Sequence, residues 1–322
     1  MARGFSKALV TGGAGFIGSH ITDRLLNEGF NVTVIDNLET GSLEKIVHNQ
    51  SKKDFRFIKG DIRDLNLVKE TMKDVDVVFH EAALASVTVS VKDPILTNEI
   101  NVTGTLNLLK ASSDFGVKRF VFASSAAVYG DTQSPQKREG VPLNPRSPYG
   151  ISKLAAENYV KIFYKLYGLE TVSLRYFNVY GPRQRFDLEC AYGGVITIFT
   201  NRVLRNMPPM VFGDGEQTRD FVYVEDVVEA NMLALKSKNA AGEAFNIGTG
   251  LSTSVNQVAE TLKEITGKKD LKNIYASPRP ADGRHGYADI SKAHKILNFH
   301  PKVSPHEGLT ALVEWCSHST YR

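Results

Sequence analysis

A glycine-rich turn near the start of the chain is the feature that most restricts how the chain can fold. The apolar run Ala8-Leu9-Val10 leads into residues 11–18, where Gly12, Gly15 and Gly18 recur at a three-residue spacing. The absent side chains let the backbone approach a pyrophosphate, and the free N–H groups of a following helix bind anions. Because a strand-like run precedes this turn and a helical segment follows it, the sequence predicts a dinucleotide site at the first strand–helix junction.

Short β-rich runs alternate with helical segments through most of the chain. The strand-like runs fall at residues 8–10, 32–35, 55–58, 75–79, 120–123, 171–176 and 244–247, and helices are predicted at residues 16–28, 93–115, 149–167, 226–236 and 255–266. This alternation is typical of a parallel sheet with helices on both faces, whose strands are almost continuously apolar. We therefore predict an α/β fold with a Rossmann-like, doubly wound parallel sheet.

Two interruptions of this alternation predict a second, smaller unit. Residues 182–221 are richer in Pro, Gly and Arg, and the irregular pattern resumes at residue 250. Between them, residues 222–249 return to the β/α rhythm. We expect residues 1–181 plus 222–249 to form the dinucleotide-binding domain, and residues 182–221 plus 250–322 to form a smaller α/β C-terminal substrate lobe.

The composition argues against several function classes. The 322 residues carry a formal net charge of +4 with no concentrated basic segment, so no nucleic-acid partner is expected. The two cysteines, Cys190 and Cys316, lack metal-ligand spacing, which favours ordinary thiols in a reducing compartment. The N-terminus lacks the apolar stretch of a signal peptide, and no segment is long enough to span a bilayer. We expect a cytoplasmic protein without a metal site or a membrane contact.

Two aspartates follow strand-like runs where a nucleotide would lie. Asp36 ends the second run, and a carboxylate there accepts both ribose hydroxyls and repels a 2′-phosphate, which favours NAD over NADP. The alternative is that Asp36 begins a turn with Asn37. Asp61 follows the third run, where it would meet an adenine amine; the alternative is a helix N-cap.

A serine, a tyrosine and a lysine form the candidate catalytic group. Tyr149 and Lys153 lie four residues apart on a predicted helix, so the phenol and the ammonium project from one face. A tyrosine that takes a proton needs a pKa below its ordinary value, and the Lys153 cation favours the phenolate. Ser125, at the end of an apolar run, would hold the same substrate oxygen. The alternative is an ordinary amphipathic pair, but together with the glycine turn these residues indicate hydride chemistry on a carbinol.

Several motifs together resemble one family over essentially the whole chain. They are residues 11–18, Asp36-Asn37, Gly60-Asp61-Ile62, His80-Glu81-Ala82-Ala83, residues 101–105, Ser124-Ser125, residues 149–153 and residues 175–183. The chain resembles the extended short-chain dehydrogenase/reductases, and within them the nucleotide-sugar 4-epimerases. The resemblance implies a UDP-sugar substrate, a tightly bound NAD, and a homodimer formed through the helices at residues 93–115 and 149–167.

The resemblance also implies which residues form the site. The catalytic residues would be Ser125, Tyr149 and Lys153. The cofactor-binding residues would be Gly12, Gly15, Phe16, Ile17, Asp36, Asn37, Asp61, Ile62, Ala82, Ala83, Asn101, Ser124, Tyr149, Lys153 and Tyr176. The substrate-binding residues would be Ser86, Ser125, Tyr149, Asn178, Val195, Arg219, Arg279, Asp282 and Gly286, with Arg219 and Arg279 on the diphosphate and Asp282 on the ribose.

The residues after Ser125 favour epimerisation over elimination. Sugar-nucleotide dehydratases carry an acid pair where this chain has Ala126 and Ala127, and alanine transfers no proton. The expected reaction is therefore removal of the O4 proton by Tyr149, hydride transfer from C4 to NAD, rotation of the 4-keto sugar, and return of the hydride to the other face. A UDP-glucuronate-type 4-epimerase, another sugar-nucleotide dehydratase or reductase, and a non-catalytic NAD-binding regulator remain as alternatives.

The width of the sugar site depends on one position. In related epimerases a residue beside the rotating sugar acts as a gate, and the resemblance places Gly286 there. A bulky aromatic gate excludes a 2-acetamido group, whereas glycine leaves room. We therefore expect UDP-GlcNAc and UDP-GalNAc to be accepted beside UDP-Glc and UDP-Gal; a one-residue slip would place Tyr287 at the gate and reverse this. Arg185 would meet the carboxylate of a uronic acid.

Overall fold

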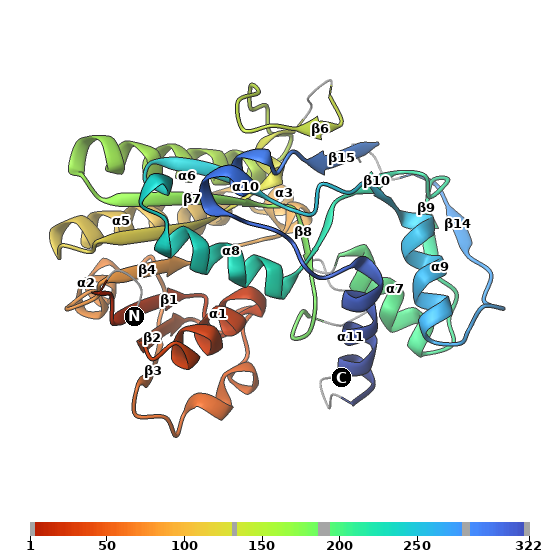
Figure 1. Cartoon of the computed structure of the whole chain (residues 1–322), viewed down its shortest axis with the longest axis horizontal. Coiled ribbons are helices and arrows are strands. Elements are labelled where there is room, and N and C mark those ends of the chain that lie inside the picture. Colours follow the sequence, from red (N-terminus) through yellow and green to blue (C-terminus); the bar gives the residue numbers. More distant parts are fainter. Residues whose placement is uncertain (1–3, 131–133, 186–193, 279–283, 319–322) are drawn as a thin grey trace.

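The computed structural model describes residues 4–130, 134–185, 194–278 and 284–318. Its centre is a parallel sheet of seven strands (Figure 1). Across the sheet the strands follow the order β12 (Glu243–Ile247), β7 (Glu170–Tyr176), β5 (Arg119–Ser125), β4 (Val77–His80), β1 (Lys7–Thr11), β2 (Asn31–Asp36) and β3 (Phe55–Lys59). Each predicted strand-like run is one of these strands, so the predicted Rossmann-like α/β fold is confirmed.

Both faces of this sheet are buried, which explains its continuously apolar strands. Val10 and Phe79 point to one face, and their neighbours Leu9 and Val78 point to the other. The first face is covered by α1 (Phe16–Asn27), α8 (Val224–Lys236) and α10 (Ser291–Leu297). The second is covered by α2 (Leu65–Thr71), α3 (Val87–Lys92), α4 (Pro94–Asn98), α5 (Gly104–Asp114) and α6 (Pro148–Tyr167).

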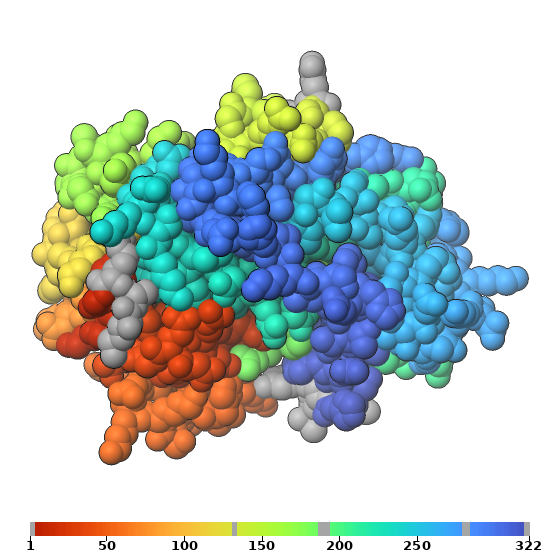
Figure 2. All heavy atoms as spheres, viewed as in Figure 1, coloured from red at the N-terminus to blue at the C-terminus, as the bar shows by residue number. Residues whose placement is uncertain are grey.

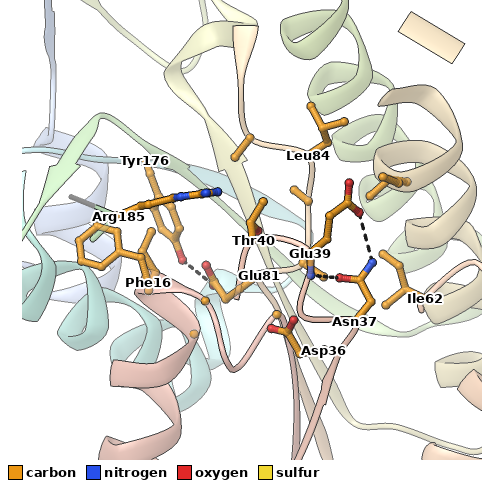
Figure 3. A pocket seen from close by; sticks show the side chains of 18 of the residues that line it. Phe16, Asp36, Asn37, Glu39, Thr40, Ile62, Glu81, Leu84, Tyr176 and Arg185 are labelled. Carbon is orange, nitrogen blue, oxygen red and sulfur yellow. Dashed lines mark hydrogen bonds between the residues drawn. The ribbon is translucent and has the colours of Figure 1, made fainter. Parts of the chain in front are cut away.

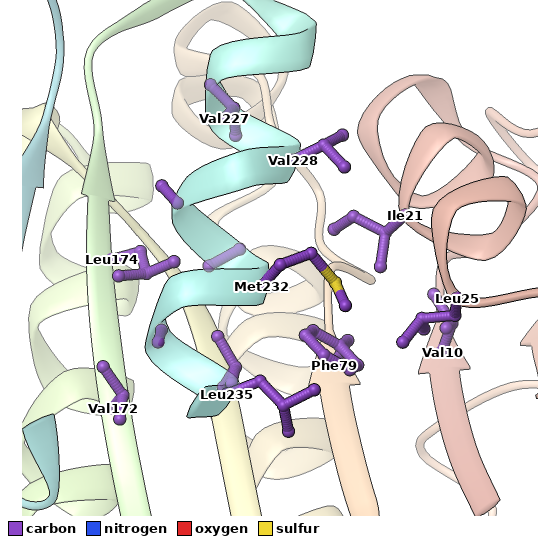
Figure 4. Close-up of a cluster of buried hydrophobic side chains, with 14 of the residues drawn as sticks. Val10, Ile21, Leu25, Phe79, Val172, Leu174, Val227, Val228, Met232 and Leu235 are labelled. Atoms are coloured by element: carbon purple, nitrogen blue, oxygen red, sulfur yellow. The ribbon is translucent and has the colours of Figure 1, made fainter. Parts of the chain in front are cut away.

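Helix α8 fills the first face at the middle of the sheet. Met232 lies between Ile21 and Leu25 of α1 and the ring of Phe79, and these four side chains are almost completely buried (Figure 4). Removing a side chain of this size from water contributes about 2 kcal/mol. This packing therefore fixes the sheet relative to α1, the helix that follows the glycine turn.

The ends of the helices follow their sequence signals. Helix α6 begins with Ser147, whose side chain accepts from the N–H of Gly150, and ends at Gly168 in a left-handed conformation with φ of 71°. The predicted helix at residues 93–115 is interrupted: α4 and α5 are separated by a π-helical turn, Glu99–Thr103. This turn packs against α6.

A second core lies beside the sheet. It is formed by α7 (Val195–Leu204), α9 (Val255–Ile265) and α11 (Pro305–His318), with the strand pair β9 (Met210–Phe212) and β14 (Ile274–Ala276) (Figure 1). Helix α10, which the predicted division assigns to the lobe, instead packs on the larger core because Ala293 and Leu297 face α8 and β12. The division at residues 181, 222 and 249 stays a prediction.

Short strands connect the two cores. One sheet has the order β13 (Thr253–Ser254), β10 (Thr218–Arg219), β15 (His285–Ala288) and β6 (Gln136–Lys137), and a separate pair joins β8 (Asn178–Tyr180) to β11 (Phe221–Tyr223). Between β10 and β11, the buried carboxylate of Asp220 accepts from the backbone N–H groups of Thr249, Gly250 and Ala288. This one side chain therefore fixes β15 relative to the loop that follows β12.

The outer surface shows how distant segments of the chain meet. On the face in Figure 2, the N-terminal third (red to orange) and the C-terminal segment (blue) both border the teal surface of the α8 region.

Among the described residues, no helix combines the length and the apolar character that a bilayer span requires.

Candidate active site

The glycine turn leaves no space for side chains. A Cβ atom on Gly18 would lie 2.3 Å from the carbonyl oxygen of Gly12, and one on Gly12 would lie 2.7 Å from the backbone nitrogen of Ala82. Gly12 also has a φ of 68°, which L-residues rarely adopt. Helix α1 begins at Phe16 without a side-chain cap, so its first N–H groups face the space above the turn.

A cavity of about 370 Å³ runs from this turn along the carboxyl ends of the strands. Parallel strands present their carboxyl ends at one edge, and a change of strand order there opens a crevice. The order reverses between β1 and β4, and residues that follow both strands line the cavity. The predicted cofactor residues that line it are Gly12, Gly15, Phe16, Ile17, Asp36, Asn37, Asp61, Ile62, Ala82, Ala83, Ser124, Tyr149 and Tyr176.

Asp36 lies at the end of the cavity nearest β2. Its Oδ2 accepts from the N–H of Ala14 at 3.0 Å and its Oδ1 from the N–H of Leu38 at 2.8 Å. Burial raises the pKa of this carboxyl, and the two backbone bonds oppose the rise. Asp36 therefore combines both interpretations of the sequence, because it fixes a turn beside Asn37 and it lines the cavity where a ribose would lie.

Asp61 lies near Asn37 on the same wall. It accepts from the Nδ2 of Asn37 at 3.2 Å and pairs with the guanidinium of Arg63 at 2.8 Å. The helix cap at α2 is Asp64, whose side chain accepts from the first N–H groups of that helix. The N-cap alternative for Asp61 is therefore wrong, and its predicted contact with an adenine stays a prediction.

Ser125 and Tyr149 meet at the opposite end of the cavity. Ser125 ends β5, Tyr149 lies in the first turn of α6, and both residues line the cavity there. Burial raises the pKa of Tyr149, the nearby hydroxyl of Ser125 lowers it, and the charge of Glu81 raises it further. The described residues alone therefore hold Tyr149 as a phenol, which differs from the expectation that Lys153 lowers its pKa.

Lys153 lies one helical turn after Tyr149 along α6. Its Nζ donates to the carbonyl oxygen of Ala123 at 2.7 Å and lies 5.0 Å from the centre of the Phe122 ring. Burial lowers the pKa of Lys153 to about 8, and the charge of Glu81 opposes this. One of the three donors of the ammonium thus holds α6 against β5. Lys153 does not itself line the cavity, and its contact with a cofactor stays a prediction.

Some predicted cofactor residues use their side chains inside the fold. Asn101 accepts from the N–H of Leu84 and donates to the Oγ of Ser152, and it does not line the cavity. The hydroxyl of Ser124 donates to Glu157 at 2.6 Å. Ser124 therefore reaches the cavity with other atoms than its hydroxyl, and the role of Asn101 toward a cofactor stays a prediction.

A second cavity of about 190 Å³ adjoins the first, because Val179 and Gln184 line both. The predicted substrate residues Asn178, Val195 and Arg219 line it. A hydrogen bond links two of these segments. The side chain of Asn178 in β8 donates to the carbonyl oxygen of Asp220, the residue after Arg219.

Other predicted substrate residues lie outside these walls. Gly286 lies in β15 beside Arg219 in β10, and Ser86 accepts from the N–H of Val89 as the cap of α3. Arg279 and Asp282 lie outside the described residues.

Sequence reasoning named Glu81 only as part of a motif. Its Oε1 accepts from the hydroxyl of Tyr176 at 2.9 Å, and it lines the cavity with Ser125 and Tyr149 (Figure 3). The signal that would have found it is its position, since it directly follows β4 at the carboxyl edge of the sheet.

These features fit a dinucleotide. The turn is a cradle that any Cβ would fill, a helix N-terminus faces it, and a carboxylate lies at the β2 end. The Ser125–Tyr149 pair lies at the other end, where the reactive ring of such a cofactor would meet a second ligand.

Comparisons with known proteins agree with this geometry. A model of the NAD dependent epimerase/dehydratase family matches residues 8–248. The chain is 45% identical over 309 residues to a putative UDP-glucose 4-epimerase of Methanocaldococcus jannaschii, covering 95% of this chain and 97% of that protein.

Two solved structures are similar over the whole fold. UDP-glucose 4-epimerase of Thermotoga maritima, solved with UDP-glucose, is 42% identical with a TM-score of 0.90, covering 97% of this chain and 98% of that one. UDP-N-acetylglucosamine 4-epimerase of Methanobrevibacter ruminantium, solved in complex with UDP-N-acetylmuramic acid, is 38% identical with a TM-score of 0.91, again covering 97% and 98%.

The position of Asp36 predicts the effect of removing its charge. In Asp36→Asn the amide oxygen keeps one backbone bond, but the anion that would hold two ribose hydroxyls is lost. We expect the affinity for NAD to fall about tenfold and the preference for NAD over NADP to narrow. Titration of cofactor-stripped protein with both dinucleotides measures this, with Glu39→Gln in the same cavity wall as the control. An unchanged ratio of the two affinities would contradict the ribose role.

Proposed function

Because the chain belongs to the NAD-dependent epimerase/dehydratase family, we propose that it inverts C4 of a UDP-sugar through a transient 4-keto intermediate. The observation that carries this proposal is that Ser125 and Tyr149 together line the inner end of the large cavity. Ala126 and Ala127 follow Ser125, so this turn offers no acid to expel water. That supports epimerisation over the dehydratase alternative.

The chain's own residues provide binding, orientation and proton transfer. The hydroxyls of Ser125 and Tyr149 hold O4 of the sugar, and Tyr149 accepts the O4 proton and later returns it. NAD, when bound, supplies the hydride acceptor for C4 and then the donor. Arg219 and Asn178 in the adjoining cavity hold the diphosphate, which leaves the sugar free to rotate.

Tyr149 becomes a base only when positive charge offsets its burial. Burial raises its pKa in the structure, and Lys153 lies on the same face of α6 one turn away. An oxidised nicotinamide ring would add a second positive charge next to the phenol. The proton therefore leaves O4 when the cofactor is ready to accept the hydride.

The space at Gly286 supports acetamido sugars. Among the described residues, the atom nearest to a Cβ on Gly286 would be the Cε of Lys137, 3.9 Å away, and the φ of Gly286 is not positive. A Cβ atom thus meets no close contact among the described residues, and we infer that this space lies beside the sugar. We infer that UDP-GlcNAc and UDP-GalNAc are accepted beside UDP-Glc and UDP-Gal.

A UDP-uronate is the second candidate substrate. Arg185 lines the large cavity together with Ser125 and Tyr149, and its guanidinium would pair with a sugar carboxylate. A uronate 4-epimerase would use the same proton and hydride steps, so the two candidates differ only in the group at C5.

We further propose a homodimer through the helices of the second face. Val91 of α3, Ile95 of α4, and Ile151 and Tyr159 of α6 are all at least 40% exposed. Helices α3 and α4 pack beside α6, and we infer that these side chains on neighbouring helices belong to one apolar surface. A surface of this kind marks an interaction site.

The first functional prediction concerns turnover itself. Purified protein without added NAD should convert UDP-glucose or UDP-GlcNAc to an equilibrium mixture of C4 epimers, observed by NMR of the anomeric protons. Tyr149→Phe should lose at least about 1,000-fold of this rate, because the phenyl ring accepts no proton. Near-normal turnover of this variant would refute the mechanism. If only a UDP-uronate reacts, the second candidate is correct; no reaction with any UDP-sugar supports the non-catalytic regulator.

The second functional prediction concerns the gate. Gly286→Tyr should lower conversion of UDP-GlcNAc at least tenfold, while conversion of UDP-glucose changes less than about threefold. Gly286→Ala is the matched control, since its methyl group fits the available space. Equal losses for both substrates in Gly286→Tyr would place the gate elsewhere.

The third prediction concerns assembly. The protein should sediment with the mass of two chains at micromolar concentration, because the apolar surface is covered in the dimer. Tyr159→Glu should sediment as a single chain, and a wild-type monomer at this concentration would contradict the proposal.

A further inference from the structure

Glu81 places a carboxyl group beside the catalytic pair that the proposed reaction does not use. It follows β4, and its Oε1 accepts from the hydroxyl of Tyr176 at 2.9 Å. That hydroxyl in turn accepts from the Nδ2 of Asn231 in α8 at 2.8 Å. The hydroxyl of Tyr176 therefore donates its hydrogen bond to Glu81. This bond holds the carboxyl in the wall of the cavity that Ser125 and Tyr149 also line.

The titratable groups around Glu81 come from three elements. Helix α6 contributes Lys153 and Tyr149, β7 contributes Tyr176, and β4 contributes His80 next to Glu81 in the chain. His80 lies between the hydroxyls of Thr11 and Thr105, and burial holds its pKa well below the ordinary value, so it is neutral. Lys153 is the cation that acts on Glu81.

The charges of these groups depend on one another. Burial raises the pKa of Glu81 to about 7, while the bond from Tyr176 and the charge of Lys153 limit the rise. A negative Glu81 in turn raises the pKa of Tyr149 and opposes the lowered pKa of Lys153. Loss of the proton from Glu81 thus makes ionisation of Tyr149 less favourable.

We propose that Glu81 is a third titrating member of the catalytic site, whose carboxylate opposes ionisation of Tyr149 and so sets the pH at which the base forms. Glu81 acts on Tyr149 through its charge and is therefore a positioning residue. The proposal rests on the proposed function only for the role of Tyr149 as the base. A purely structural role would instead be to hold the hydroxyl of Tyr176.

Two variants separate charge from hydrogen bonding. In Glu81→Gln the amide oxygen still accepts from Tyr176 but the charge is lost, whereas Glu81→Asp keeps a charge in the cavity. The readout is the tyrosinate absorbance of the NAD-loaded protein across pH, after subtraction of the same curve for Tyr149→Phe. We expect the midpoint of Tyr149 to fall by about one pH unit in Glu81→Gln and by less than half of that in Glu81→Asp. An unchanged midpoint in Glu81→Gln, or equal shifts in both variants, would overturn the proposal.

Thermal unfolding gives an independent readout. The folded-state pKa of Glu81, about 7, lies above its ordinary value of 4.5. Between pH 4.5 and 7 the folded protein therefore binds more protons than the unfolded chain, and its stability falls as the pH rises through this range. At about pH 8, Glu81→Gln should therefore have a higher melting temperature than the wild type. This difference in melting temperature should disappear at about pH 5. A difference that does not change with pH would indicate a structural role alone.

The wild type provides a test that needs no variant to fold. A protonated carboxyl absorbs in the infrared as a carbonyl, and this band should disappear with a midpoint of about 7. If no such band titrates near this pH, the proposal fails. None of these readouts uses a sugar nucleotide, so a failure of epimerisation and a failure of the Glu81 proposal are distinguishable.

Discussion

A buried ion pair fixes the helix that carries the catalytic tyrosine. Arg175, near the end of β7, binds the carboxylate of Glu157 in α6 through its Nε and Nη2, and the Nη2 contact measures 2.6 Å. Glu157 also accepts from the hydroxyl of Ser124, and Lys153 in the same helix donates to Ala123. Charges buried this deeply persist only when they are paired and hydrogen-bonded, so α6 has little freedom to slide along the sheet. The distance between Tyr149 and Ser125, and with it the whole reaction, depends on this arrangement.

The same network reaches the substrate side of the molecule. Arg175 also donates to the hydroxyl of Tyr129, which donates to Asn246 at the end of the sheet. Asn246 donates in turn to the carbonyl oxygens of Lys137, in β6, and of Asp289, which follows β15, the strand that contains Gly286. A continuous set of buried polar contacts therefore joins α6, which carries Tyr149, to β15, which carries Gly286. These contacts fix the catalytic residues and the predicted gate relative to each other, although they come from separate segments of the chain.

Sequence patterns predicted the parts of this site that depend on local chemistry. Gly12 and Gly18 lie where a side chain would collide with backbone, and Ser125, Tyr149 and Asp36 lie at strand ends or helix starts that hydrophobic periodicity marks. What the sequence did not reveal depends on contacts between distant segments. The amide of Asn101 is used by Leu84 and Ser152, and Glu81 meets Tyr176 across three strands of the sheet. The raised pKa of Tyr149 likewise follows from burial and from Glu81, which spacing along the helix does not show.

In the proposed reaction, one site removes a hydride from C4 and returns it to the same carbon. Conversion of a UDP-sugar labelled with deuterium at C4, followed by NMR without added cofactor, tests this most directly. The epimer should retain deuterium at C4, because the label would pass to the bound cofactor and back without meeting water. Loss of the label to solvent during epimerisation would contradict it, since that result requires proton abstraction from carbon by a different mechanism.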